Sequence, residues 1–262
     1  MTAPAALLSV NPIDWGIVGP ALLAGLLVLA THVPLGLQVL RKGIVFIDLA
    51  IAQIAGLGVI AAGALGWEPQ GWAVQAAAMA AAVGGALLMT WMERRWPDIQ
   101  EALIGALFVL ASSVGILLLA GNPHGGEHLK DLLVGQILWV TPGQLWAEAG
   151  LTAVLLALWF GLRERLGRVG FYLLFALAVT ASVQLVGVYL VFSSLIMPAL
   201  AVRRAPARWQ LPLAWVGGAL AYALGLALSA VLDLPSGAVV VLVMASVCVG
   251  LAAGLSRQRP AP

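Results

Sequence analysis

The sequence predicts an all-α, polytopic integral membrane protein with about eight or nine transmembrane helices. Hydrophobic residues make up 62% of the 262 residues, and charged residues only 9%. A water-soluble domain carries roughly a quarter charged residues, so most of this chain must lie in lipid. We therefore expect residues 1–262 to form a single transmembrane domain, with 1–15 as an outer segment and 256–262 as a cytosolic tail.

Apolar runs about as long as a bilayer is thick follow one another along the chain. In order they are Ile17–Leu40, Ile44–Leu65, Trp72–Met92, Ala102–Ala120, Leu145–Leu162, Val169–Val186, Val188–Val202, Leu211–Leu232 and Ser236–Leu255. Short polar segments separate most of them: Arg41–Lys42, Trp67–Gly71, Glu93–Asp98, Asn122–Asp131, Arg163–Arg168, Arg203–Arg208 and Asp233–Pro235.

The basic residues indicate the orientation. Of the 13 lysines and arginines, all except Lys130 fall in segments on one side of the predicted spans. Cytosolic loops carry an excess of Lys and Arg, so the N-terminus is expected outside and the C-terminus in the cytosol. We therefore expect a multi-pass protein of the inner, or plasma, membrane.

The stretch between Arg168 and Arg203 must contain unusual helices. Both arginines are expected on the cytosolic side, so the intervening chain crosses twice with roughly 17 residues for each crossing, near the minimum. Gly187 and Pro198 are the helix breakers in this stretch. We expect a short or broken pair of helices near 188–203 that acts in gating. The apolar segment Leu132–Val140 is too short to span and is expected as a re-entrant or interfacial helix.

Five segments, in order, carry a family resemblance. They are PLGLQVLRKGIVFID (Pro34–Asp48), EALIGALFVLASSVGILLL (Glu101–Leu119), LLVGQILWVTPGQLW (Leu132–Trp146), VQLVGVYLVFSSLIMPALAVRR (Val183–Arg204) and DLPSGAVVVLVMASV (Asp233–Val247). Together they resemble the membrane permease subunits of ATP-binding-cassette importers for zinc and manganese. The resemblance implies a homodimer in the bilayer, a cytosolic ATPase dimer, and a periplasmic or extracellular metal-binding protein.

Asp48 is the first candidate for the metal pathway. It opens an apolar run, about 10 Å below the cytosolic surface, where a carboxylate is costly unless a cation or partner compensates it. The alternative is a side chain that reaches back to Arg41 and Lys42. The family has a histidine four residues after this aspartate, and that position here is Ala52. The neighbouring Gln53 is a possible substitute.

His32 is a second candidate, at a depth similar to that of Asp48 on the preceding helix. We hypothesise that it supplies the imidazole missing at position 52, because imidazole and carboxylate are suitable ligands for first-row metals. The alternative is a hydrogen bond to a backbone carbonyl freed by Pro34. Glu101 is either a pathway residue or, with Asp98 three residues before it, part of a helix cap.

Two further sets of residues are candidates for contacts outside the membrane. The outer loop contains His124, Glu127 and His128, which either capture a cation at the outer mouth or form a solvated loop. The candidate docking surface for an ATPase is shorter than the family's and consists of Arg163, Glu164, Arg165, Arg168, Arg203, Arg204 and Arg208. Simple positive-inside anchoring would explain Arg203, Arg204 and Arg208 equally well.

Several functions are excluded or left as alternatives. The chain has no glycine-rich phosphate-binding motif with its lysine, so we expect no ATPase site of its own and no enzyme activity. The basic residues are explained by topology, which leaves no support for nucleic-acid binding. The predicted function is the permease of an ATP-driven importer of zinc or manganese, with no permanently bound cofactor. The alternatives are an ATP-independent facilitator or secondary carrier, a permease for a metal chelate, and a non-transporting scaffold.

Overall fold

The computed structural model describes residues 14–67, 71–119 and 133–257, and its regular structure in these ranges is helical. The elements are α1 (Trp15–Lys42), α2 (Ile47–Ala64), α3 (Trp72–Arg95), η2 (Pro97–Ile99), α4 (Gln100–Leu119), η3 (Ile137–Trp139), α6 (Pro142–Val186), α7 (Val188–Ala201), α8 (Ala207–Leu232) and α9 (Ser236–Arg257). Gly167 divides α6 into two helices, because its φ of 58° is not helical.

The described helices confirm the predicted polytopic membrane fold. Seven of them are long and apolar enough to cross a bilayer, counting the two parts of α6, Pro142–Leu162 and Gly167–Val186, separately. Two shorter apolar helices, Ile47–Gly63 and Val188–Ala201, complete the set found in these residues. Each predicted span therefore corresponds to an observed helix, with ends that differ by a few residues.

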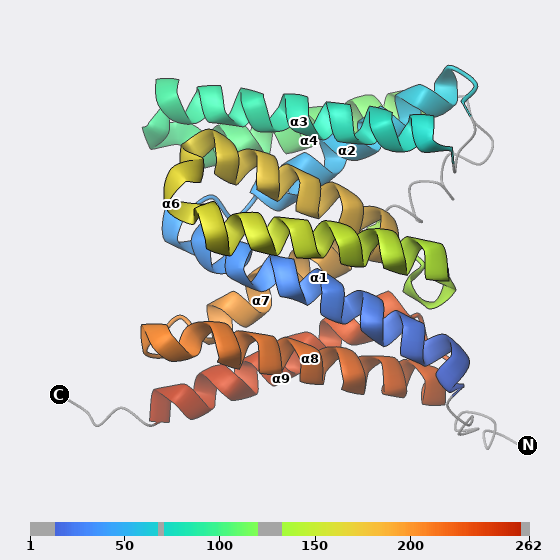
Figure 1. The fold of residues 1–262 in the computed structure, drawn as a ribbon, viewed down its shortest axis with the longest axis vertical. Helices are drawn as coiled ribbons and strands as arrows, with labels where there is room; N and C mark the ends of the chain where they lie inside the picture. Colours follow the sequence, from blue (N-terminus) through green and yellow to red (C-terminus); the bar gives the residue numbers. More distant parts are fainter. Residues whose placement is uncertain (1–13, 68–70, 120–132, 258–262) are drawn as a thin grey trace, which may run out of the picture.

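The helices pack in three tiers (Figure 1). At the top of that view, α2 packs against α3 and α4, and at the bottom α8 packs against α9. Between them α1 and α6 run alongside each other, and α7 packs against both α1 and α9. Gly36 of α1 faces the carbonyl of Leu195 in α7, and a Cβ at that position would overlap it. The missing side chain lets these two helices approach closely.

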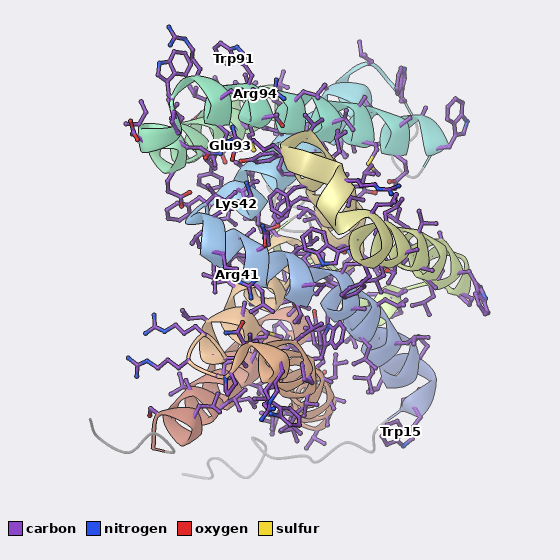
Figure 2. The ribbon with its side chains drawn as sticks, turned by 60° about the vertical axis from the view of Figure 1, so that its left-hand side comes forward. Trp15, Arg41, Lys42, Trp91, Glu93 and Arg94 are labelled. Atoms are coloured by element: carbon purple, nitrogen blue, oxygen red, sulfur yellow. The ribbon has the colours of Figure 1, made fainter. Side chains whose placement is uncertain are left out.

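The two ends of the bundle differ in chemistry. Figure 2 shows Arg41, Lys42 and Arg94 near one end of their helices, far from Trp15 at the start of α1. Exposed tryptophans occur near the helix ends at both ends of the bundle, as an aromatic belt at each membrane interface requires. They are Trp91, Trp96 and Trp209 at the arginine-rich end, and Trp15, Trp67, Trp72, Trp139 and Trp146 at the other end. We assign the arginine-rich end to the cytosol by the positive-inside rule.

The break expected near 188–203 lies at Gly187. Its φ of 83° and ψ of 161° end α6 and begin α7. The helix that follows is short, as predicted, with 14 residues, but it is not broken: Pro198 lies inside it. Gly135 packs directly against Val186 and Gly187, and a Cβ on either glycine would overlap the opposing backbone.

The helix expected over Leu132–Val140 is interrupted in the part that the structure describes. Gly135 has a φ of 69°, and only Ile137–Trp139 forms a short 3-10 helix. The 3-10 helix contacts α1 and α9, and Gly135 before it packs against the α6–α7 break. Glycine at 135 is required twice here, for the left-handed backbone and for the close approach to Gly187.

Candidate metal pathway

Asp48 lies in the first turn of α2, fully buried from solvent. Among the described residues, no group donates a hydrogen bond to either of its carboxylate oxygens. Its position near a helix N-terminus offers only partial compensation, because the helix dipole is worth a fraction of a full charge. A buried acid left without a partner in this way is typical of a functional site in a membrane protein.

The structure does not show Asp48 reaching back to the basic residues at the end of α1. Arg41 donates instead to Oε1 of Gln210, at 3.1 Å, and Lys42 pairs with Glu93, also at 3.1 Å. Gln210 in turn donates to the carbonyl of Ala205, so Arg41 joins α1 to the turn before α8. Both cations are thus engaged elsewhere.

Glu101 belongs to the same corner of the molecule as Asp48. Its Oε1 accepts a hydrogen bond of 3.1 Å from the backbone N–H of Phe46, the residue that precedes α2. Glu101 therefore caps α2 rather than its own helix, which begins at Gln100 after a 3-10 turn that contains Asp98. Its Oε2 is buried without a hydrogen-bond partner. The start of α2 thus gathers two acidic side chains with three unpartnered oxygens.

His32 lies apart from this corner. It is buried in α1, and its Nδ1 is 2.9 Å from the carbonyl oxygen of Val28 and 3.1 Å from the hydroxyl of Thr31. The carbonyl differs from the one that Pro34 leaves without a donor, that of Ala30. α1 packs along α6, α7 and α8 but not along α2. The structure therefore does not bring His32 and Asp48 together, and Nε2 of His32 has no hydrogen-bond partner.

Ala52 and Gln53 border a small pocket one turn beyond Asp48. The pocket lies between α2, α4 and the α6–α7 break, and it is lined by Ala52, Gln53, Gly56, Leu57, Ile60, Ala111, Ser112, Gly115, Val183 and Val188. Its polar side chains are Gln53 and Ser112. The absence of a side chain larger than a methyl group at position 52 helps to leave this space open. In the described part of the chain, no three His, Cys, Asp or Glu side chains gather as a metal cluster would.

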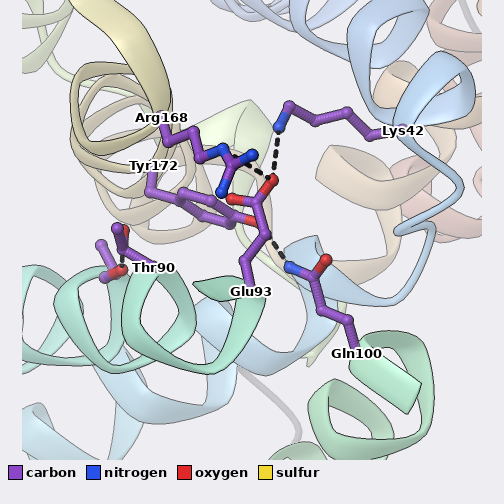
Figure 3. Close-up of polar contacts among 7 residues, drawn as sticks. Lys42, Thr90, Glu93, Gln100, Arg168 and Tyr172 are labelled. Carbon is purple, nitrogen blue, oxygen red and sulfur yellow. Dashed lines mark hydrogen bonds and ion pairs between the residues drawn. The ribbon is translucent and has the colours of Figure 1, made fainter. Parts of the chain in front are cut away.

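A polar network ties four elements together at the cytosolic end (Figure 3). Oε1 of Glu93 in α3 is 3.1 Å from Nζ of Lys42 in α1 and 3.8 Å from Nε of Arg168 in α6. Gln100, at the start of α4, donates to the hydroxyl of Tyr172. Lys42 also lies over the Tyr172 ring, 5.7 Å from its centroid. Charge-assisted contacts of this kind hold the inner ends of these helices in one arrangement.

The remaining predicted residues are placed as follows. Arg165, Arg168, Arg203, Arg204 and Arg208 are exposed near the predicted cytosolic surface, on two separate turns. The backbones of Arg163 and Glu164 belong to α6, but their side chains lie outside the described set, and His124, Glu127 and His128 lie outside the described residues altogether. Of the two expected helix breakers, Gly187 departs from helical geometry and Pro198 does not.

Sequence reasoning missed two kinds of polar residue. The network around Glu93 and Tyr172 joins residues far apart in the chain, and no local pattern indicates such pairing. Glu148 is different: it is buried within the first half of α6, and it is the only acid in its own apolar run, Leu145–Leu162. The same signal that singled out Asp48 could have found Glu148.

The family assignment comes from the whole length of the helical region. Residues 15–167 and 160–253 match the pattern of the ABC 3 transport family. The chain belongs to the ABC 3 transport family. Two solved structures share its fold. The first is PsaBC from Streptococcus pneumoniae in complex with Fab, with a TM-score of 0.72, 21% sequence identity and coverage of 89% of this chain and 90% of that one. The second is a metal-chelate type ABC transporter in an inward-facing conformation, with a TM-score of 0.67, 16% sequence identity and coverage of 97% of this chain and 94% of that one.

Curated relatives match part of this ABC 3 family chain. An uncharacterized membrane protein of Synechocystis is 30% identical over 181 residues, which are 60% of this chain and 64% of that protein. The manganese transport system membrane protein MntC of Halalkalibacterium halodurans is 30% identical over 167 residues, 55% of this chain and 56% of its own length. The matched region thus spans less than two thirds of each relative.

Proposed function

We propose that this chain is the transmembrane permease subunit of an ATP-driven importer of divalent metal ions. The observation that carries the proposal is Asp48, a fully buried carboxylate whose two oxygens have no partner among the described residues. Membership of the ABC 3 transport family gives the general class of function. A cation passing the start of α2 would supply the charge that Asp48 lacks, and Glu101 would offer it a second acid.

Manganese is the metal that the donor set favours. Carboxylate and water oxygens suit Mn²⁺, whereas Zn²⁺ sites in proteins usually include imidazole or thiolate. The position where the family's histidine is expected holds Ala52, and His32 packs elsewhere. The name of the relative MntC, a manganese transport protein, agrees with this preference. The metal is cargo in this proposal and not a resident cofactor.

Import would proceed by alternating access with ATP hydrolysed on a separate subunit. The exposed arginines of the two cytosolic turns, Arg165 and Arg168 on one and Arg203 and Arg208 on the other, offer a docking surface for a cytosolic ATPase. Arg168 contacts Glu93, so movement of its turn would reach α3 and α1 through the network of Figure 3. A second copy of the chain, a metal-binding protein outside the cell and the plasma membrane complete the proposed assembly.

The first test is Asp48→Asn, which keeps the shape of the side chain and removes its charge. We expect manganese uptake by cells that express the complete transporter to fall at least tenfold, with unchanged amounts of protein in the membrane. Asp98→Asn is the matched control, because Asp98 is exposed at the same end of the molecule. Wild-type uptake in both variants would refute the pathway at Asp48.

The same cells separate the proposed importer from its alternatives. Uptake that persists when the partner ATPase is deleted or inactivated would favour an ATP-independent facilitator. Uptake that requires a chelator would favour a permease for a metal chelate. Growth that does not depend on the chain in manganese-poor medium would favour a scaffold.

A further inference from the structure

Glu148 is a buried acid that the proposed metal pathway does not use. It lies six residues after Pro142, about 9 Å into the first half of α6, and its exposed fraction is 7%. The hydroxyl of Ser182, in the second half of α6, donates to its Oε1 at 3.3 Å. Among the described residues, no basic side chain forms an ion pair with it.

The first half of α6 buries a single stripe, and Glu148 begins it. The buried residues are Glu148, Thr152, Leu155 and Trp159, spaced by four, three and four residues, so they share one helix face. Thr152 is 4% exposed, and its hydroxyl has no hydrogen-bond partner. Thr152 thus lies one turn from Glu148 on the same helix face, but its hydroxyl makes no hydrogen bond to the carboxyl group.

These groups satisfy a neutral carboxylic acid better than a carboxylate. Ser182 donates to Oε1, and a protonated carboxyl group needs no cation to balance it. Among the described residues, an ionised Glu148 would have one neutral hydroxyl donor and no ion-pair partner, which is unfavourable in a buried site. One carboxylate with two hydroxyls is also a poorer metal site than the start of α2, which has two carboxylates.

We propose that Glu148 is a proton-binding site in the outer half of the molecule. Its carboxyl carries a proton while the two halves of α6 are packed together, and the proton is exchanged with water on the outer side when they separate. Atoms and charge balance with water alone as the partner: the carboxylic acid gives a carboxylate and a hydrated proton.

Within the described part of the chain, no other ionisable group on the packed elements forms an ion pair with Glu148. α6 packs against α1, α2, α3 and α7. On the outer half of these helices the ionisable groups are Asp14, which caps α1 on the exposed surface, and Tyr189, which is 54% exposed. The other ionisable side chains that the structure describes on these helices lie at mid-depth or toward the predicted cytosolic end: His32, Arg41, Lys42, Asp48, Glu93, Arg94, Arg95, Arg165, Arg168 and Tyr172.

The position of Ser182 links the protonation of Glu148 to the α6–α7 break, and so to transport. Ser182 lies five residues before Gly187, so its contact with Glu148 secures the segment that leads into the α6–α7 break. Acid on the outer side would favour the packed arrangement, and alkali, by removing the proton, would weaken it. This use of the site rests on the proposed transport function, whereas the protonation of Glu148 does not.

Infrared spectroscopy of the purified permease in lipid nanodiscs tests the protonation directly. At neutral pH, the difference between wild type and Glu148→Gln should contain the carbonyl band of a protonated carboxylic acid. Asp233→Asn, which changes an exposed acid at the outer end of α8, should give no such band. A difference that contains only carboxylate bands would overturn the proposal, as would an acid band that disappears when Mn²⁺ or Na⁺ is added at constant pH.

A second variant tests the site without removing the acid. Ser182→Ala keeps Glu148 and should move its carbonyl band to higher frequency, because the band loses the hydrogen bond at Oε1. An unshifted band would contradict the contact and overturn the proposal. In transporting cells, Glu148→Gln should flatten the dependence of the uptake rate on outer pH. Infrared support combined with no uptake by wild type would instead refute the transport function alone.

Discussion

At the scale of single residues, the start of α2 holds charge that the protein itself does not balance. Asp48 and Glu101 have three buried oxygens without partners. Leaving a buried polar atom unpaired costs about 1–3 kcal/mol, and more when the group is charged. A cost of this size is consistent with a site whose charge a passing cation balances. The residue one turn further along α2, at position 52, would then influence which metal the site selects.

Ala52→His tests which metal the site selects. The new imidazole would lie one turn from Asp48 on the same side of α2, beside the pocket that Ala52 borders. An added nitrogen ligand should raise the affinity for Zn²⁺ on the order of tenfold, about 1.4 kcal/mol, and that for Mn²⁺ by less. Competition between the two metals in an uptake assay measures this change in selectivity.

Ala52→Phe is the control for Ala52→His, because it adds a ring of similar size without a nitrogen. It should lower the uptake of both metals or leave both unchanged, without altering their ratio. The same zinc-to-manganese ratio in wild type and Ala52→His would show that position 52 does not face the path of the cation.

The sequence predicted that Asp48 is a buried acid, but it did not predict which groups surround it. An acid in an apolar run is visible in the sequence, because the bilayer makes its cost large wherever it faces. The pairing of His32 with Asp48 depended on equal depth in consecutive helices. Depth leaves open the rotation of each helix and the order in which helices pack, and α1 and α2 belong to different tiers.

At the scale of elements, the α6–α7 break depends on Gly187. Its φ of 83° with a ψ of 161° is a conformation that only glycine adopts readily, and its Cα faces the backbone of Gly135. Gly187→Ala should therefore cost on the order of 1–3 kcal/mol in backbone strain, with a further cost for the overlap. We expect a melting temperature about 5–10 °C lower by a thermal shift assay in detergent.

Gly150→Ala is the matched control for Gly187→Ala. Gly150 is helical and exposed in α6, and a Cβ there would meet no atom within 4 Å. Alanine is the better helix former, so the melting temperature should stay the same or rise slightly. Equal melting temperatures for the two variants would mean that the segment around Gly135 is not packed on the break.

Element boundaries, including the break at Gly187, were predictable from length and hydropathy, whereas the continuous helix through Pro198 was not. A run of 34 residues between two cytosolic arginines required two short crossings, and the structure has them on either side of Gly187. Both Gly187 and Pro198 were expected to contribute. Pro198 stays inside α7 because a bilayer-buried helix tolerates proline when neighbouring helices pack around it, as α1 and α9 do here.

At the scale of the whole molecule, the three tiers and the two ends have different origins. The tiers come from helix packing, which brings together residues such as Glu93 and Tyr172 that have no sequence relationship, so the sequence alone did not predict them. The chemical difference between the two ends comes from the distribution of arginine, lysine and tryptophan, which the sequence shows directly. The sequence therefore predicts an orientation in the membrane, but it does not predict the arrangement of helices within the bundle.

Single-cysteine labelling tests this orientation. Leu234→Cys lies in the turn between α8 and α9, and Arg208→Cys lies in the first turn of α8, at its opposite end; both native residues are exposed. The native Cys248 is 6% exposed and is replaced by alanine in both variants. A membrane-impermeant maleimide should label position 234 on intact cells and position 208 only after permeabilisation. The opposite pattern would place the arginine-rich turns outside, where no cytosolic ATPase could reach Arg165, Arg168 or Arg203, and the proposed coupling would fail.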